Sequence, residues 1–192
     1  MSDPLQKAHR QPANSNLPTS DRELFDALDR ERLYEYLNMQ VRNIWRVDGL
    51  YFLGIEKRHG MAEATQVDAD CWAYMGKTEA RELKAFLGID EPSPAQMLTI
   101  LRHTSWAVSH AAKSFAERPD GSVSFAVDAC RTQLIRIDKG LEPHPCRMVR
   151  EGYLQAFVRE CNPKVALEVV SCPPERTRQD LWCLWVLKWA DK

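Results

Sequence analysis

Cysteines are the residues of this 192-residue chain with the clearest capacity for chemistry. Cys172 and Cys183 stand at the two ends of a polar loop, where a hairpin would bring two thiols to one point. Cys146 is expected to begin a helix, where the helix dipole lowers a thiol pKa and favours the thiolate. These three with Cys130, a histidine such as His144 or a water could form a tetrahedral zinc site. The spacing is equally compatible with buried structural cysteines, because the chain has no Cys-x-x-Cys pair.

Two further cysteines are expected to be small buried residues. Cys71 stands beside Trp72, and Cys161 is expected near a helix C-terminus. Free cysteine is among the residues most often buried. We therefore expect Cys71 and Cys161 to pack in the core rather than to bind metal.

A second set of chemical groups shares one face of a predicted helix. Trp45, Asp48, Phe52, Glu56 and His59 recur at steps of three and four residues, which places them on one side of a helix. As a pocket wall they would bind a polar, ring-containing ligand, and Glu56 and His59 could exchange a proton with a substrate. The alternative is that this side is the solvent-facing edge of the helix, beside an apolar stripe. That stripe consists of Ile44, Val47, Tyr51 and Ile55.

Gln133 and Arg136 are further pocket candidates if their segment is helical. They would then share one face, and Arg136 could hold a ligand carboxylate through two parallel hydrogen bonds. The segment itself is ambiguous between helix and strand.

The first half of the chain predicts helices. Residues 1–19 are polar and predict a disordered tail. The sequence Ser20-Asp21-Arg22-Glu23 matches a capping box, and apolar residues at helical spacing follow to about residue 45. Further helices are predicted over 45–59, 70–87 and 93–103. Glycines at 60 and 88 and a second capping box, at residues 93–96, set their ends.

The second half predicts an antiparallel sheet. Pro119-Asp120-Gly121 is a turn sequence between two extended runs. A helix is predicted over 147–161, and strands over 165–171 and 182–190. The order predicts an α+β fold, in which N-terminal helices precede an antiparallel sheet with an inserted helix. We expect a single domain over 20–192, with a helical part (20–103) and a sheet part (104–192).

Composition excludes several partners and reactions. The formal net charge is −1 and no basic run is present, so we expect neither nucleic acid nor a membrane as partner. No segment approaches the roughly 20 apolar residues that span a bilayer, and no secretory signal is present. We therefore expect a cytoplasmic protein with reduced cysteines. Phosphate-binding loops and dinucleotide fingerprints are absent, which argues against kinase and nicotinamide chemistry.

Three C-terminal segments together resemble a known domain. They are Glu-Gly-Tyr-Leu-Gln-Ala-Phe at 151–157, Val-Ala-Leu-Glu-Val-Val-Ser-Cys at 165–172, and Cys183-Leu184-Trp185. This order of a glycine-containing helix, a strand ending in Glu and Cys, a loop and Cys-x-aromatic resembles the end of the 4-vinyl-reductase domain. Phenol-sensing members of that superfamily bind zinc through three cysteines beside an aromatic-ligand pocket. The resemblance implies a fold like that of the 4-vinyl-reductase domain, zinc at Cys146, Cys172 and Cys183, and, by analogy, a homodimer.

A longer pattern covers the chain from Trp45 onward. It comprises Trp45-x-x-Asp48-Gly49-x-x-Phe52-x-x-x-Glu56, Cys130-x-x-Gln133-x-x-Arg136, Gly140-Leu141, Pro145-Cys146, Cys172-Pro173-Pro174 and Cys183-x-Trp185. It resembles a family of small cytosolic proteins grouped with L-2-amino-thiazoline-4-carboxylate hydrolase-like proteins. This resemblance implies a hydrolase-like relationship without fixing an activity.

Two functions follow as hypotheses. The first is a zinc-binding cytosolic domain that binds a small hydrophobic or aromatic ligand. The alternative is a small zinc- or cysteine-dependent hydrolase that acts on a C–N or C–S bond of a small heterocyclic substrate. Zinc would then activate water with Glu56 or His59 as general base, or Cys130 or Cys146 would be the nucleophile. Three thiolate ligands make zinc a weak Lewis acid, which favours the structural role.

Overall fold

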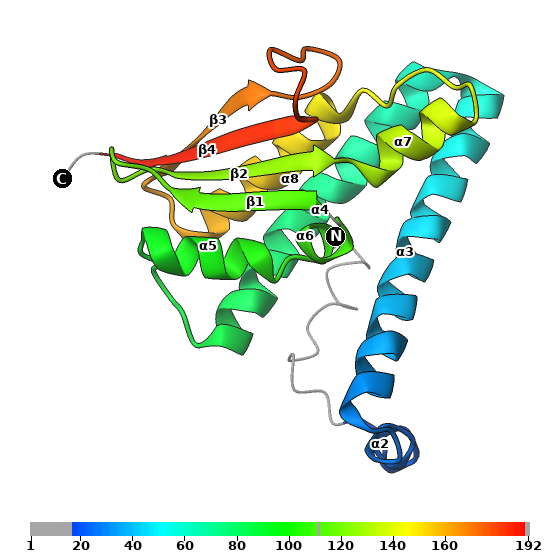
Figure 1. Ribbon diagram of the computed structural model, residues 1–192, viewed down its shortest axis with the longest axis vertical. Helices are drawn as coiled ribbons and strands as arrows, with labels where there is room; N and C mark the ends of the chain where they lie inside the picture. The colour runs from blue at the N-terminus through cyan, green and yellow to red at the C-terminus, as the bar shows by residue number, and fades with distance from the viewer. Residues whose placement is uncertain (1–16, 111, 191–192) are drawn as a thin grey trace, which may run out of the picture. The chain divides into compact units, whose positions relative to one another are not determined.

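The computed structural model describes residues 17–110 and 112–190 (Figure 1). Most of the tail predicted over 1–19 therefore lies outside the described residues. Contacts along the chain divide it into two compact units, 1–43 and 44–192. The boundary falls inside one long helix.

The first unit contains helix α2 (Thr19–Asp26) and the first half of helix α3 (Arg30–His59). The predicted capping box at Ser20 is wrong, because the carbonyl of Pro18 already accepts hydrogen bonds from the Asp21 and Arg22 amides. Ser20 consequently lies inside the first turn, and its hydroxyl donates to Asp21. The predicted continuous helix to residue 45 is also interrupted, since the Asp29 carboxylate accepts from the Arg32 amide and begins a new helix.

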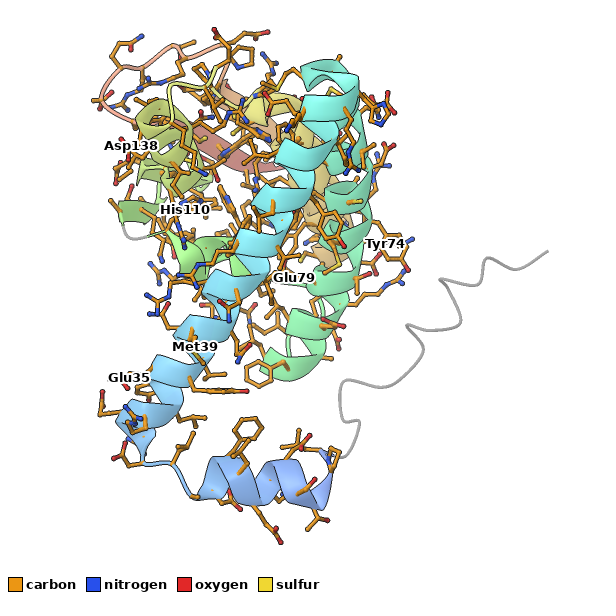
Figure 2. All side chains as sticks on the ribbon, turned by 90° about the vertical axis from the view of Figure 1, so that its right-hand side faces the viewer. Glu35, Met39, Tyr74, Glu79, His110 and Asp138 are labelled. Atoms are coloured by element: carbon orange, nitrogen blue, oxygen red, sulfur yellow. The ribbon has the colours of Figure 1, made fainter. Side chains whose placement is uncertain are left out.

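The second unit begins with two helices whose C-terminal ends agree with the glycine positions. Helix α3 ends before Gly60, which has a φ of 89°, and α4 (Met61–Leu87) follows at once. Helix α4 thus starts nine residues before the predicted residue 70, and it ends at Gly88, whose φ of 66° terminates the helix. Figure 2 shows that Tyr74 projects outward from α4, on the side away from the buried Glu79.

Helix α5 (Pro94–Arg102) confirms the second capping box. The Ser93 hydroxyl accepts from the Gln96 amide, and the Gln96 side chain accepts from the Ser93 amide. Helix α6 (Ser105–Ser109) follows and leads into the sheet.

Four strands form one antiparallel sheet in the order β1-β2-β4-β3. They are β1 (Ala112–Glu117), β2 (Val123–Ala129), β3 (Val165–Ser171) and β4 (Cys183–Trp189). Helix α7 (Arg131–Asp138) follows β2, so the ambiguous segment is helical, and α8 (Cys146–Cys161) precedes β3. Helices α8 and α4 pack together on one face of the sheet (Figure 1). The predicted α+β fold is confirmed.

The sheet topology brings distant cysteines to one end of the sheet. In the antiparallel pair β2–β4, Val127 lies opposite Cys183, and Cys130 follows the end of β2. In the pair β3–β4, Ser171 lies opposite Leu184, so Cys172 also reaches this end. Helix α8 begins with Cys146 beside this end of the sheet, because the Arg147 amide donates a hydrogen bond to the Pro173 carbonyl at 2.8 Å.

No helix among the described residues is long and apolar enough to cross a membrane.

Candidate functional site

A cavity of about 300 Å³ lies between α3, α4 and α7 in the second unit. Two aromatic side chains of α3, Trp45 and Phe52, line it. Trp45 also stacks on Trp72, with ring centroids 5.0 Å apart and an interplanar angle of 11°. Apolar side chains from α3 and α7 complete much of the lining, and four cationic side chains and two carboxylates add polarity. The lining residues are Trp45, Arg46, Asp48, Gly49, Leu50, Phe52, Leu53, Asp68, His110, Arg131, Thr132, Ile135, Arg136, Lys139, Leu141 and His144.

The face of α3 singled out in the sequence is turned toward this cavity. Trp45, Asp48 and Phe52 line it, and Phe52 is buried. The neighbouring apolar stripe is the exposed side instead: Ile44 is 62% exposed and Tyr51 is 71% exposed. The structure therefore favours the pocket-wall interpretation of this helix face over the solvent-edge interpretation.

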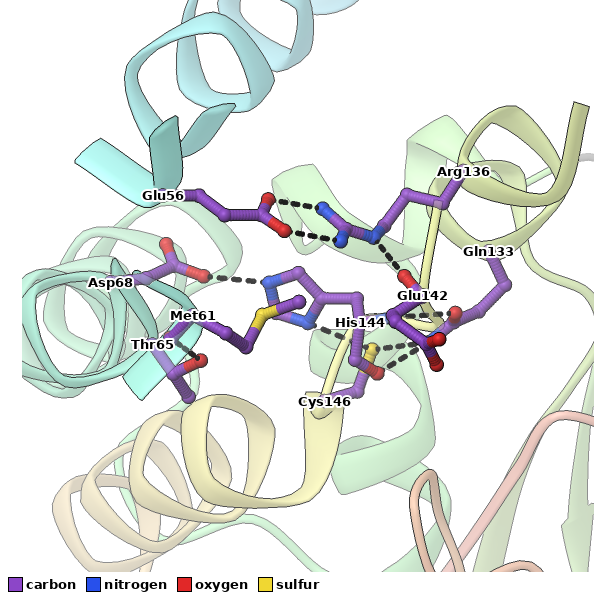
Figure 3. A network of polar contacts seen from close by, with 9 residues as sticks. All are labelled: Glu56, Met61, Thr65, Asp68, Gln133, Arg136, Glu142, His144 and Cys146. Atoms are coloured by element: carbon purple, nitrogen blue, oxygen red, sulfur yellow. Dashed lines mark hydrogen bonds and ion pairs between the residues drawn. The ribbon is translucent and has the colours of Figure 1, made fainter. Parts of the chain in front are cut away.

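Glu56 and Arg136 form a bidentate ion pair beside the cavity (Figure 3). Both guanidinium nitrogens donate to the carboxylate at 2.8 Å, and Arg136 Nε donates to the Glu142 carbonyl at 2.5 Å. The hydrogen bonds from Arg136 lower the pKa of Glu56, which holds it ionised. Arg136 is thus occupied within the protein rather than free for a ligand carboxylate. His59, the other proposed proton-transfer residue, is exposed and outside the cavity lining.

His144 connects a carboxylate to a thiol across the cavity wall (Figure 3). Its Nε2 lies 3.3 Å from Asp68 Oδ2, and its Nδ1 lies 3.3 Å from Cys146 Sγ. Gln133 fixes this arrangement, because its amide nitrogen donates to the His144 carbonyl at 2.7 Å and to Cys146 Sγ at 3.0 Å. The result is a continuous chain of carboxylate, imidazole and thiol.

Asp48 is the cavity carboxyl whose ionisation is most perturbed. Burial raises its pKa to about 6, and the nearby Asp68 carboxylate adds to the increase. Arg150 and a hydrogen bond to Trp72 act in the opposite direction but only offset part of it. A carboxyl with this pKa carries a proton for part of the time near neutral pH, so it can donate or accept one there.

The predicted convergence of Cys172 and Cys183 is confirmed, with their sulfurs 3.7 Å apart. The expectation that the position of Cys146 at the start of α8 favours its thiolate form is wrong. Burial raises the pKa of Cys146 well above its usual range, and the neighbouring Cys130 and Cys183 raise it further. Burial at this position therefore outweighs the helix dipole.

The four clustered cysteines fit zinc in part. Two sulfurs on one tetrahedral zinc ion stand about 3.8 Å apart, which matches the spacing of Cys172 and Cys183. Cys130 and Cys146 are near enough to interact electrostatically with Cys183. Even so, no three His, Cys, Asp or Glu side chains of the described residues are already arranged around a single metal position. Cys146 is turned instead toward His144 and Gln133.

Two cysteines lie outside this cluster. Cys161 is buried as predicted, whereas Cys71 is exposed. The prediction for Cys71 is wrong because the inward side of α4 at this point is occupied by the large ring of Trp72.

Two buried polar side chains were not anticipated from the sequence. His110 lines the cavity, is 5% exposed, and neither of its ring nitrogens has a hydrogen-bond partner among the described residues (Figure 2). Burial lowers its pKa to about 3, so the ring is neutral. Arg150 is 9% exposed and its Nη1 likewise has no hydrogen-bond partner in the part of the chain described. No local motif surrounds either residue, so only its position in the fold identifies it.

Residues 26–189 match the family described as "Family of unknown function (DUF6125)". The chain belongs to this family. The matched segment includes every residue that lines the cavity and all six cysteines. No curated protein matches the chain, and no solved structure matches it.

Proposed function

We propose that this DUF6125 protein is a small-molecule-binding domain like the 4-vinyl-reductase domain, whose cavity takes a small aromatic ligand and whose cysteine cluster holds zinc. The observation that carries the first part is the cavity beside the Trp45–Trp72 stack. Its volume of about 300 Å³ is at the lower end for ligand pockets, which suits a molecule of one ring. Trp45, which stacks on Trp72, would offer such a ring a flat apolar surface.

The cavity also contains polar groups that can orient a ligand. Asp48 and His110 both line it, and neither is engaged in an ion pair among the described residues. A ligand hydroxyl or amine could hydrogen-bond to such groups while its ring lies against the aromatic wall. This combination of an apolar lining with a few polar groups is typical of specific ligand sites.

Ligand binding is tested by calorimetric titration with phenol, with cyclohexanol as a non-aromatic molecule of similar size. We expect phenol to bind more tightly. Ile135→Trp should abolish the heat of binding, because Ile135 lines the cavity and the larger side chain would fill it. Ile137→Trp is the matched control on the same helix, outside the lining. Equal binding by both variants, or none by the unaltered protein, would contradict the assignment of this cavity.

Zinc is proposed as the ion held by Cys130, Cys146, Cys172 and Cys183. Soft thiolate sulfur suits zinc, and such sites brace small folds. Elemental analysis of purified protein should find about one zinc per chain. Cys172→Ser should lose the metal and lower the melting temperature, whereas Cys71→Ser, at an exposed cysteine, should change neither. Protein without zinc and with six free thiols would refute this part.

The Asp68–His144–Cys146 chain favours a second candidate function, a cysteine-dependent hydrolase. A thiol beside an imidazole that a carboxylate orients is the arrangement of many nucleophilic enzymes. On this hypothesis, metal-free protein treated with p-nitrophenyl acetate should release a burst of one nitrophenolate per chain. Cys146→Ala should remove the burst and Cys130→Ala should keep it. Absence of a burst would dismiss this candidate.

A further inference from the structure

Arg150 is a buried cation that aromatic rings separate from the cavity. Only 9% of its surface is exposed, and its Nη1 makes no hydrogen bond to any described residue. Its guanidinium carbon lies 5.1 Å from the ring centroid of Trp72, which stacks on the cavity residue Trp45. The same carbon lies 4.4 Å from the centroid of Trp106, whose ring meets the cavity residue His110 edge-on at 5.1 Å. One ring thus stands between this charge and the cavity lining at each of two places.

The charge of Arg150 is fixed and has no counter-ion within the described residues. No carboxylate of these residues forms an ion pair with it, and an arginine does not lose its proton in a protein. Burial raises the pKa of Asp48 and lowers that of His110, and Arg150 lowers the pKa of both groups. Because both line the cavity, the field of Arg150 extends into it. A negative charge placed there would be stabilised.

The lining itself also contains more cations than carboxylates. Arg136 is paired with Glu56. Arg131, at the start of α7, and Lys139, just after its end, form no side-chain hydrogen bond or ion pair with other described residues. Arg131 is half-buried and Lys139 is exposed, so these two cations border the solvent side of the cavity.

The two carboxylates of the lining are both engaged by other groups. Asp68 Oδ2 lies 3.3 Å from Nε2 of His144. Asp48 accepts a hydrogen bond from Trp72, and burial together with Asp68 raises its pKa to about 6, so it carries less than a full charge near neutral pH. The lining therefore keeps more positive than negative charge.

We propose that the cavity binds an aromatic carboxylic acid as its anion. This inference rests on the ligand-binding function proposed above and specifies the charge of the ligand. The ring lies against Trp45 and Phe52, which supply the apolar surface. The carboxylate lies toward Arg131 and Lys139, and the buried charge of Arg150 favours the anion over a neutral molecule of the same shape.

The test compares benzoate with benzamide by calorimetric titration near neutral pH and at low ionic strength. The two molecules have nearly the same shape, but only benzoate is charged. We expect benzoate to bind about 10-fold more tightly, because hydrogen bonds and contacts between charged groups are the stronger ones. Added salt should weaken the binding of benzoate and leave that of benzamide unchanged, since salt screens the cations at the solvent side.

Variants of the three cations identify the source of this preference. Arg150→Met should remove most of it, and Arg159→Met, at an exposed arginine of the same helix outside the lining, is the matched control. Arg131→Gln and Lys139→Gln should each weaken benzoate binding roughly 2- to 5-fold, as expected for partly exposed charges. Benzamide should bind every variant as it binds the unaltered protein, which shows that the cavity is intact. If Arg150→Met does not fold, Arg150→Gln carries the same comparison.

The outcomes separate this inference from the proposed function. Equal binding of benzoate and benzamide to the unaltered protein would overturn the inference and leave the cavity as a site for neutral aromatic molecules. A preference for benzoate that persists in all three cation variants would also overturn it, because the charge would then be recognised elsewhere. If benzoate, benzamide and phenol all fail to bind, the proposed function fails and the inference fails with it.

Discussion

At the scale of single residues, Asp48 gives the protein a specific dependence on pH. Its pKa is about 6 in the folded protein against an ordinary value of 3.8, mainly because of burial. The folded state therefore binds a proton more readily than the unfolded state between these values. Stability from this group is fully present below pH 4 and is lost as pH rises through 6, by about 2–3 kcal/mol.

Asp48→Asn should remove this penalty. The amide oxygen can still accept the Trp72 hydrogen bond, but no charge is buried above pH 6. We expect the variant to be more stable than the unaltered protein at pH 8, by up to about 2 kcal/mol, and no more stable at pH 4. Urea unfolding at both pH values measures the difference. A variant that is less stable at pH 8 would show that the ionised carboxylate is needed there.

The site residues that could be predicted from the sequence lie close together in the chain, within one helix. Trp45, Asp48 and Phe52 were recognised because they repeat along one helix, and their common face does line the cavity. Asp68 and His110 were missed, because they come from other elements and become neighbours only through tertiary packing. The roles proposed for Glu56 and Arg136 assumed free side chains. Their pairing across 80 residues could not be inferred from either segment.

At the scale of elements, the packing of α4 against α8 depends on one glycine. A Cβ at Gly76 would lie 2.3 Å from the Tyr153 carbonyl oxygen. This contact involves backbone, so one of the helices would have to move. Gly152, on the opposite helix, is different: a Cβ there would lie 3.7 Å from the Ala73 Cβ, an ordinary contact.

The two glycines provide a matched pair of substitutions. Gly76→Ala should destabilise the protein by roughly 2–4 kcal/mol, because forced separation of packed helices outweighs the better helix propensity of alanine. Gly152→Ala should be neutral or stabilising by up to about 1 kcal/mol. Thermal unfolding of both variants tests the prediction. Similar melting temperatures for the two would show that α4 and α8 can separate at little cost.

Element ends were predictable where local chemistry determines them. Ser93 and Gln96 form the predicted capping box, and Gly60 and Gly88 end their helices as expected. The helix starts at Asp29 and Met61 were missed. At Asp29 a single carboxylate caps the helix without a capping-box partner. At Met61 the helix follows Gly60 with no side-chain cap at all, so the sequence carries no signature of its beginning.

At the scale of the whole molecule, the candidate site belongs to one compact unit. Every residue that lines the cavity, and every cysteine, falls within 44–192. The ion pair of Glu56 with Arg136 and the Asp68–His144–Cys146 chain fall there as well. The second unit thus contains all the groups on which the proposed functions depend.

This distribution predicts that residues 1–42 are dispensable for the site. A chain that begins at residue 43 would retain Asn43, a favourable N-cap residue, at the new start of α3. A chain that begins at residue 29 is the matched control, because it keeps the cap of α3 at Asp29. The tryptophan region of the near-ultraviolet circular dichroism spectrum, to which the Trp45–Trp72 stack contributes, and the zinc content should agree between the two. Loss of either property only in the shorter chain would mean that the first half of α3 holds the cavity wall in place, and that the site requires both units.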